Sequence, residues 1–298
     1  MKGICLAANY TIISYIKVRQ NMISRSKQTQ KADLPVISTF PVDIGGGLMV
    51  GGDQLILMAG PCSVESYEQT RESAEAIATA GGRVLRGGAY KPRTSPDTFQ
   101  GLGRPGLEIL RAVADEFNLL VVTEALAVEH VPIVAEMADI IQIGSRNMQH
   151  YPLLWAVGEL DKPVLLKRGY MATISEWLSA ADHIERRGNQ RILLCERGIR
   201  TFDPSTRNTM DANAIVLAKQ ISPYPVIADP SHATGRSDLV IPIARAAVAA
   251  GADGLLVEFH PDPNSALSDG PQSLPLTSLS TFYAQVGPIA AACNRELV

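Results

Sequence analysis

The sequence predicts an α/β protein, a single (β/α)8 barrel that follows a short N-terminal β-hairpin. Three observations support this fold class: eight short apolar runs recur along the 298-residue chain, stretches with helical periodicity separate them, and polar residues follow each run directly. Nearly continuous apolar runs are typical of parallel strands that are buried on both faces. Their alternation with helices over about 250 residues indicates a closed barrel, with a doubly wound open sheet as the alternative.

The predicted strands begin with the hairpin, in which residues 42–44 and 48–50 flank a glycine-rich turn. The eight strands of the barrel are expected at residues 55–59, 84–85, 119–122, 140–143, 164–166, 192–194, 226–228 and 255–257. No repeat, low-complexity segment or linker interrupts this series, so we expect one catalytic domain over residues 40–298.

Helix boundaries are indicated by capping residues between the strands. Ser66 and Gln69 have the spacing of a capping box, which predicts the start of the first helix. Ser175 is expected to cap the helix that carries Trp177. In a later helix, the periodicity places Leu217 on the buried face.

The composition argues against a nucleic-acid or membrane partner. The chain is 46% hydrophobic and 19% charged, and its net charge of −3 provides no basic surface for nucleic acid. The apolar stretch over residues 3–16 is interrupted by polar residues and is too short to span a bilayer. The four cysteines are scattered and form no CxxC pair, which favours a reducing cytoplasm.

The start of the chain differs in charge from the remainder. Residues 1–32 contain six basic and no acidic residues, whereas the rest of the chain has a net charge of −9. We expect residues 1–39 to form a poorly ordered N-terminal extension. A transit peptide is one alternative, because such peptides are basic and poor in acidic residues, and translation from Met22 is another.

Basic side chains follow several predicted strands, at the end of the barrel where barrel enzymes hold their active sites. They are Arg86, Lys91, Arg93, Arg146, Lys167, Arg168 and Arg197. Arginine binds carboxylate and phosphate oxygens in a bidentate manner, and lysine supplies a compact charge. Because so many like charges repel one another without a counterion, the group predicts a ligand with more than one anionic group.

A second group of strand-end residues offers mixed sulfur, nitrogen and oxygen donors: Cys62, His232, Glu258 and Asp269. Such a set suits Mn, Fe, Co or Zn better than Mg, which prefers oxygen ligands alone. The four residues lie far apart in sequence, so two interpretations stay open at this point. Either they bind one metal ion, or Cys62 is a small buried residue and Asp269 belongs to a turn.

From about residue 54 to 275 the chain resembles the type I-beta 3-deoxy-D-arabino-heptulosonate 7-phosphate (DAHP) synthases. The motifs that carry this resemblance occur in order as AGPCSVES, LRGGAYKPRTSP, QIGSRNMQ, VLLKRG, CERGIRTF, IADPSHATG, LLVEFHPDP and SDGPQSL. Together they cover the whole predicted barrel. The resemblance implies condensation of phosphoenolpyruvate with erythrose 4-phosphate, the first step of aromatic amino-acid biosynthesis through the shikimate pathway.

The resemblance also implies a role for individual residues. It implies that Cys62, His232, Glu258 and Asp269 bind one divalent metal ion, Mn2+ or alternatively Fe2+, Co2+ or Zn2+. It assigns phosphoenolpyruvate to Arg86, Lys91, Ser145, Arg146, Lys167 and Arg197, and erythrose 4-phosphate to Lys91, Pro92, Arg93 and Thr94. Catalytic roles are expected for Lys91, Cys62 and His232, with Lys91 as a proton donor. The resemblance further implies a homo-oligomer, either a tetramer or a dimer.

The chain departs from the expected family pattern at two positions. Ser145 stands where Ala is usual, and His150 stands where Asn is usual. The added hydroxyl of Ser145 puts the phosphate contacts beside Arg146 in doubt.

Two other functions remain as alternatives. A 3-deoxy-D-manno-octulosonate 8-phosphate synthase uses arabinose 5-phosphate on the same barrel, but that family tends to carry Lys-Ala-Asn-Arg-Ser-Ser after the second strand. This chain has Lys91-Pro92-Arg93-Thr94-Ser95 there, which favours the four-carbon sugar. The other alternative is a non-catalytic phosphosugar-binding barrel.

Overall fold

Eight parallel strands form a closed barrel in the structure, a computed structural model that describes residues 38–92 and 95–298. The strands are β3 (Gln54–Gly60), β4 (Val84–Arg86), β5 (Leu120–Glu124), β6 (Ile140–Ile143), β7 (Val164–Lys167), β8 (Ile192–Glu196), β9 (Val226–Ala228) and β10 (Gly254–His260). Each strand pairs with the next, and β10 pairs with β3 from Gly254 opposite Ile56 to Glu258 opposite Gly60. This last pairing confirms the closed barrel and rules out the open sheet.

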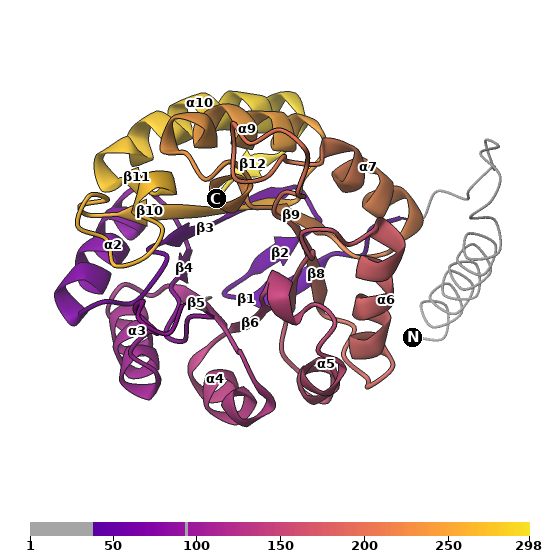
Figure 1. The fold of residues 1–298 in the computed structure, drawn as a ribbon. Coiled ribbons are helices and arrows are strands. Elements are labelled where there is room, and N and C mark those ends of the chain that lie inside the picture. The colour runs from indigo at the N-terminus through magenta and orange to yellow at the C-terminus, as the bar shows by residue number, and fades with distance from the viewer. Residues whose placement is uncertain (1–37, 93–94) are drawn as a thin grey trace.

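Helices surround the barrel and connect its strands (Figure 1). They are α2 (Tyr67–Thr79), α3 (Arg104–Glu116), α4 (Val131–Met137), α5 (Tyr151–Gly158), α6 (Ile174–Glu185), α7 (Ala212–Ile221), α8 (Pro230–Thr234), α9 (Ser237–Ala249) and α10 (Leu279–Ala292). Short 3-10 helices cover Val128–His130, Ser145–Asn147, Gly270–Gln272 and Leu276–Ser278. Two short strands extend the sheet, since β11 (Leu274–Pro275) pairs with β10 and β12 (Glu296–Leu297) pairs with β3.

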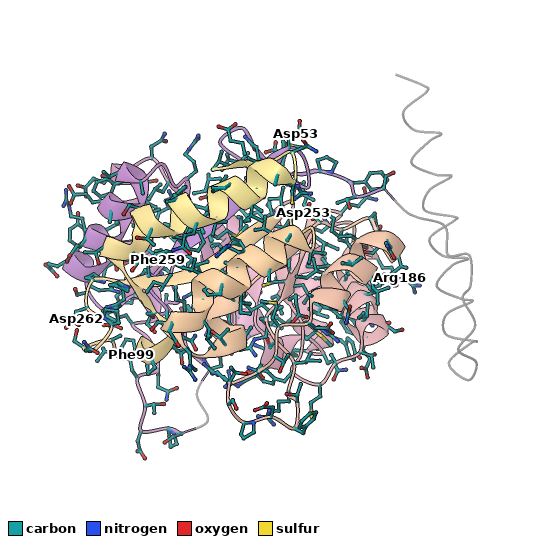
Figure 2. All side chains as sticks on the ribbon, turned by 90° about the horizontal axis from the view of Figure 1, so that it is seen from above. Asp53, Phe99, Arg186, Asp253, Phe259 and Asp262 are labelled. Carbon is teal, nitrogen blue, oxygen red and sulfur yellow. The ribbon has the colours of Figure 1, made fainter. Side chains whose placement is uncertain are left out.

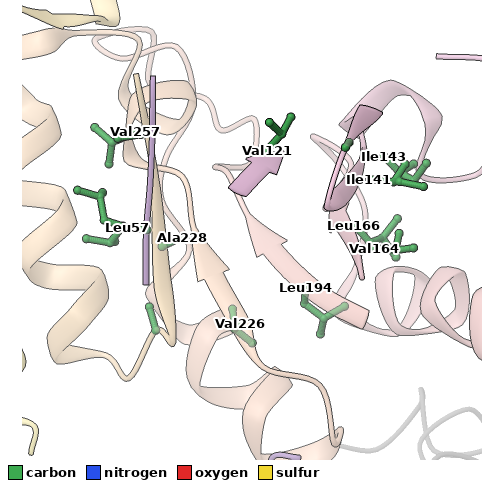
Figure 3. Packing of buried hydrophobic residues seen from close by; sticks show 14 of the residues in the cluster. Leu57, Val121, Ile141, Ile143, Val164, Leu166, Leu194, Val226, Ala228 and Val257 are labelled. Carbon is green, nitrogen blue, oxygen red and sulfur yellow. The ribbon is translucent and has the colours of Figure 1, made fainter. Parts of the chain in front are cut away.

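Alternate residues of each strand enter two different hydrophobic clusters, as the two-residue period of a strand requires. In β3, Leu55 and Leu57 face the helices, whereas Ile56 and Met58 face the barrel interior. Figure 3 shows the outer cluster, which includes Leu57 and other labelled strand residues. The strands are thus buried on both faces, in agreement with their apolar sequences.

The predicted hairpin is confirmed and closes one end of the barrel. It consists of β1 (Val42–Gly45) and β2 (Leu48–Val50), whose apolar side chains join the interior cluster. Arg83 and Arg191, which precede β4 and β8, donate hydrogen bonds to hairpin carbonyls at 3.1 and 2.7 Å. The hairpin therefore lies at the N-terminal ends of the strands, and the opposite end of the barrel is free for a site.

Two helices differ from the prediction, α6 in its capping residue and α7 in its buried face. Thr173 rather than Ser175 caps α6, because its side chain accepts a hydrogen bond from the backbone N–H of Glu176, which in turn accepts from Thr173 N–H. In α7, Leu217 is 40% exposed and was wrongly placed on the buried face. The prediction for Ser66 is confirmed, since its hydroxyl accepts from the N–H of Gln69 at 3.1 Å.

The N-terminal extension lies mostly outside the described residues, so its expected disorder stays a prediction. Within residues 38–92 and 95–298, no helix is both long and apolar enough to cross a membrane.

Asp253 connects the last barrel strand to the C-terminal segment. Figure 2 shows it with Asp53 at the end of the barrel opposite Phe99 and Asp262. Its fully buried carboxylate lies 2.6 Å from Lys219 Nζ and 2.8 Å from Arg295 Nη2. It also accepts a 2.8 Å hydrogen bond from Val226 N–H, at the start of β9.

Replacing Asp253 with Asn is therefore expected to lower the free energy of unfolding by about 3–5 kcal/mol, because two largely buried cations lose their shared anion. Denaturant unfolding followed by circular dichroism measures this loss. Asp161→Asn is the matched control, since that carboxylate is 96% exposed beside Arg191 and its loss should leave stability unchanged. Equal stability of both variants would contradict the assignment.

Candidate active site

Polar side chains continue the inward-facing rows of the barrel beyond the apolar interior. The inward positions at the C-terminal ends of β4, β5, β7, β9 and β10 hold Arg86, Glu124, Lys167, Asp229 and Glu258. A pocket of about 350 Å³ opens at this end. It is lined by Lys91, Pro92, Ser95, Thr98, Glu124, Arg146, Tyr170, Arg197, Arg207, His232 and Asp269.

The predicted metal-binding residues converge at one side of this pocket. Cys62 follows β3, His232 lies in α8, Glu258 belongs to β10 and Asp269 follows β10. One potential ligand atom from each residue lies within 4.8 Å of all the others. His232 Nε2 is 3.3 Å from Glu258 Oε1 and 3.9 Å from Asp269 Oδ2, and Cys62 Sγ is 3.2 Å from Asp269 Oδ2. These separations suit atoms that share one ion.

Asp229 fixes the imidazole within this group. Its carboxylate caps α8 by accepting the N–H of His232 at 2.9 Å, and its second oxygen lies 2.8 Å from His232 Nδ1. The same oxygen lies 2.6 Å from Lys167 Nζ. Although burial opposes ionisation of Asp229, His232 and Lys167 lower its pKa well below the usual range. An anchored Nδ1 leaves Nε2 to face the other three residues.

The electrostatics of the group favour a cation. Burial, with a further contribution from Glu258, raises the pKa of the Cys62 thiol to about 11. Burial also opposes ionisation of Glu258, yet His232 and Arg86 keep its pKa below the ordinary value. Arg86 and Arg207 compensate part of the charge of the two carboxylates, at 2.7 and 3.2 Å, and a bound metal cation would in addition favour the thiolate form of Cys62. The mixed sulfur, nitrogen and oxygen donors fit a divalent metal ion of the transition series.

The predicted anion-binding residues fall into two kinds in the structure. Lys91, Arg146 and Arg197 line the pocket, whereas Arg86 and Lys167 are buried in ion pairs with Glu258 and Asp229. Arg197 is 2% exposed, and among the described residues its Nη1 has no hydrogen-bond partner. Burial lowers its pKa, and the ring of Tyr170 lies 4.6 Å from its guanidinium carbon. A buried, unpartnered guanidinium nitrogen at a pocket wall is suited to an anionic ligand.

Of the other residues predicted to bind substrate, the structure describes Pro92 and Ser145 but not residues 93 and 94. Pro92 lines the pocket, and Ser145 begins the 3-10 helix that carries Arg146. Arg93 and Thr94 lie outside the described residues, so their assignment to erythrose 4-phosphate stays a prediction.

Arg168 does not belong to the cationic group in which it was predicted. It is buried and lies 3.0 Å from Glu196 and 2.9 Å from Asp211, with the ring of Trp177 5.9 Å away. Because successive strand residues face opposite sides, Arg168 points toward the helices while Lys167 points into the barrel. Cys195, at the end of β8, belongs to the apolar interior cluster. Burial raises the pKa of this thiol.

Several residues at the site were not predicted from sequence. Arg207 lies in the long connection between β8 and α7, where no strand end marks it, and Tyr170 lies three residues after β7. Gln272 lies in the 3-10 helix after Asp269 and donates a 2.6 Å hydrogen bond to Glu258 Oε2. Glu124 did carry a signal, because it ends β5 on the inward side. Burial raises the pKa of its carboxyl group.

The fold and the site define a (β/α)8-barrel protein that presents cationic side chains and a candidate metal-binding set around one pocket. The family model described as the DAHP synthetase I family matches residues 29–293. Phospho-2-dehydro-3-deoxyheptonate aldolase of Thermotoga maritima is 52% identical over 247 residues, which cover 83% of this chain and 73% of that protein. The chain therefore belongs to the DAHP synthetase I family, as its motifs predict.

A solved structure and a more distant relative add to this comparison. The crystal structure of the Thermotoga maritima DAHP synthase matches with a TM-score of 0.85 and 50% identity, covering 88% of this chain and 76% of that one. A 2-dehydro-3-deoxyphosphooctonate aldolase of Geobacter sulfurreducens is 32% identical over 265 residues, covering 83% of this chain and 96% of that protein. The chain is thus more similar to a heptonate enzyme than to this octonate enzyme.

Proposed function

We propose that this protein is a metal-dependent DAHP synthase, which condenses phosphoenolpyruvate with erythrose 4-phosphate and releases phosphate. The observation that carries the proposal is the pocket in which Arg146, Arg197 and Lys91 lie beside the cluster of Cys62, His232, Glu258 and Asp269. Its cationic side chains suit an enol phosphate that carries both a phosphate and a carboxylate group. The 52% identity to a heptonate aldolase supports the choice of reaction.

The ligands of the proposed metal ion are Cys62 Sγ, His232 Nε2 and one oxygen each of Glu258 and Asp269. We propose one Mn2+, Fe2+, Co2+ or Zn2+ ion, because the mixed donor set does not favour Mg2+. When bound, such an ion acts as a Lewis acid that polarises the aldehyde and orients the sugar.

The chain's own residues bind and orient the two substrates. Arg146 and Arg197 line the pocket, and we propose that they bind the phosphate of phosphoenolpyruvate. Arg86 and Lys167, held in buried pairs, supply positive potential behind it. Pro92, Arg93 and Thr94 are proposed to hold erythrose 4-phosphate. Fixing both substrates converts a bimolecular encounter into a step within one complex.

The bond changes need no nucleophilic side chain. Carbon 3 of phosphoenolpyruvate forms a bond to the aldehyde carbon, and the aldehyde oxygen gains a proton. Water adds to carbon 2, and phosphate leaves with the oxygen that joined it to carbon 2. The water oxygen becomes the ketone oxygen and loses both protons, one balancing the proton gained by the aldehyde oxygen and the other taken up by the phosphate. The cations stabilise the charge that develops on the phosphate and the aldehyde oxygen.

Lys91 is the proposed donor of the proton to the aldehyde oxygen. Its Nζ lies 2.9 Å from Cys62 Sγ and 2.8 Å from the Cys62 carbonyl oxygen, which places the ammonium beside the metal-binding cluster. Lys91→Met keeps an unbranched apolar side chain that ends where the ammonium is attached, and it removes the proton donor, so kcat should fall by about 10²–10⁴-fold, the usual contribution of a general acid. Steady-state phosphate release measures this, and near-normal kcat with weaker substrate binding would show that Lys91 only binds.

The octulosonate alternative differs in the sugar acceptor. Phosphate release from phosphoenolpyruvate, measured in parallel with erythrose 4-phosphate and arabinose 5-phosphate, tests the proposed function. We expect a kcat/KM at least about tenfold higher with the four-carbon sugar, which corresponds to about 1.4 kcal/mol of discrimination. Preference for arabinose 5-phosphate would reverse the assignment, and phosphoenolpyruvate binding without turnover on either sugar would favour a non-catalytic barrel.

Two further properties, the cellular location and the oligomeric state, are part of the proposal. We propose a cytoplasmic enzyme, in line with the free thiols of Cys62, Cys195 and Cys293 among the described residues. A homo-oligomer, dimer or tetramer, is proposed from the family resemblance alone. Analytical ultracentrifugation measures its size.

A further inference from the structure

Arg207 and Asn208 hold the backbone of α8 although they belong to the distant connection between β8 and α7. Their N–H groups donate to the carbonyls of Thr234 and Ala233 at 3.0 and 2.8 Å. Asn208 Nδ2 also donates to the carbonyl of His232 at 3.2 Å. The position of His232 therefore depends on this dipeptide.

Two glycines leave the space that the dipeptide occupies. A Cβ atom on Gly235 would lie 2.5 Å from the Cβ of Arg207, and one on Gly198 would lie 2.7 Å from the Cβ of Asn208. Both glycines have positive φ angles, of 67° and 89°, which other residues rarely adopt. Larger residues at these positions would displace the dipeptide from α8.

The side chain of Arg207 reaches the carboxylates of the metal-binding cluster. Its Nη1 lies 3.2 Å from Asp269 Oδ1, the oxygen opposite the one that faces Cys62 and His232. The same nitrogen donates to Gln272 Oε1 at 2.9 Å. Gln272 Nε2 in turn donates to Glu258 Oε2 at 2.6 Å, while Glu258 Oε1 lies 3.3 Å from His232 Nε2 and also accepts from Arg86 Nη1 at 2.7 Å.

We propose that Arg207 and Gln272 are a coupled pair of positioning residues for the metal site. Each occupies one oxygen of a carboxylate, Arg207 on Asp269 and Gln272 on Glu258, so that the other oxygen is directed toward Cys62 Sγ and His232 Nε2. Neither residue supplies a ligand. The inference rests on the metal site proposed above, and it adds a reason for the arrangement of both carboxylates.

Asp269 has a left-handed backbone conformation, and its carboxylate is held by Arg207. Asp269 has φ of 54°, which Asp adopts more readily than most residues but still at some cost. The last side-chain torsion of Asp is broad, so an external contact holds the carboxylate in one orientation. Arg207 provides such a contact from one side, and the carboxylate oxygen near Cys62 is left for the ion.

Gln272 is the more informative residue to replace, because it is 2% exposed and is not among the residues that line the pocket. Gln272→Met preserves length and removes both hydrogen bonds, and Arg207→Met preserves the aliphatic part of the side chain. Loss of such outer contacts typically weakens metal binding by about 10–100-fold. Arg207→Lys should retain most of the affinity, because both contacts of Arg207 come from a single nitrogen that an ammonium can replace.

The experiment titrates metal-free protein with Co2+ and follows thiolate-to-metal charge-transfer absorption, with calorimetry of Mn2+ binding in parallel. Wild type, Gln272→Met, Arg207→Met, Arg207→Lys and the double methionine variant are compared. Arg236→Met is the matched control, since Arg236 pairs with Asp238 through exposed side chains (53% and 61%). Thermal unfolding of each metal-free variant verifies that it is folded.

If the two residues position the carboxylates, the Kd for the metal ion should be about 10–100-fold higher in Gln272→Met. The Kd should also rise in Arg207→Met, return most of the way to the wild-type value in Arg207→Lys, and stay unchanged in the control. The double variant should lose less than the sum of the two free-energy losses, because the two residues contact each other. Two results would overturn the pair but not the metal site, provided that the wild type binds metal. One is a Kd of both single methionine variants within twofold of the wild-type value, and the other is strict additivity of the two free-energy losses. Absence of metal binding by the wild type would overturn the pair and the proposed metal site together.

Discussion

Cys62→Ala is expected to abolish metal binding at micromolar concentrations and to lower turnover by at least about 10³-fold. Cys62 supplies the single sulfur donor of the cluster, and its Sγ lies 3.2 Å from Asp269 Oδ2 and 2.9 Å from Lys91 Nζ. A Lewis-acid metal contributes several kcal/mol to a transition state, and each 1.36 kcal/mol is tenfold in rate. Metal content by atomic spectroscopy and phosphate release measure the two effects.

Cys293→Ala is the matched control for this substitution. Cys293 is a partly buried free cysteine at the C-terminal cap of α10, with its Sγ 3.8 Å from the carbonyl of Val248. Its loss should leave metal content and turnover unchanged. A Cys62→Ala protein that retains one metal ion per chain would exclude the thiol from the ligand set.

The second large effect is expected for Arg197→Ala, which should weaken phosphoenolpyruvate binding roughly 30- to 5,000-fold. Arg197 is almost fully buried and has a free Nη1 among the described residues, so an anionic ligand completes its hydrogen bonding. Removing one partner of a buried, hydrogen-bonded charge pair costs about 2–5 kcal/mol. Isothermal calorimetry with phosphoenolpyruvate measures the affinity directly.

Two further variants separate charge from geometry at this position. Arg197→Lys keeps a positive charge but loses the bidentate fork, so we expect an intermediate affinity. Arg187→Ala is the matched control, since Arg187 follows α6, lies over the Trp155 ring at 4.9 Å and is 43% exposed. If Arg197→Ala bound phosphoenolpyruvate as tightly as wild type, the phosphate would have to bind elsewhere.

Much of the fold was predictable because strand and helix periodicities are local properties of the sequence. The apolar runs marked all eight barrel strands, and the glycine-rich turn marked the hairpin. The cap of α6 was misplaced because Thr173 and Ser175 are both suitable residues, and only the reciprocal bonds with Glu176 decide between them. Leu217 was assigned to the buried face of α7 because apolar residues occupy more of this helix than the face that is buried. Periodicity alone therefore does not show which of them face the solvent.

The site was predictable only in part, because strand ends can be read from sequence but partners across the barrel cannot. Lys167 and Arg168 are adjacent cations, yet one pairs with Asp229 and the other with Glu196 and Asp211. The two-residue period of a strand would have separated them. Arg207 follows no strand, so its contacts with the metal-binding cluster are evident only from the folded chain.

The most direct test of the proposed function measures phosphate release from phosphoenolpyruvate and erythrose 4-phosphate before chelation, after exhaustive chelation with EDTA, and after addition of Mn2+. We expect turnover in the untreated protein, its loss on chelation, and its recovery with Mn2+ under reducing conditions that keep Cys62 as a thiol. Chelation should leave the protein folded, because the apolar clusters inside and outside the barrel do not depend on the ion. Full activity after the metal content has fallen below the enzyme concentration would contradict a metal-dependent synthase.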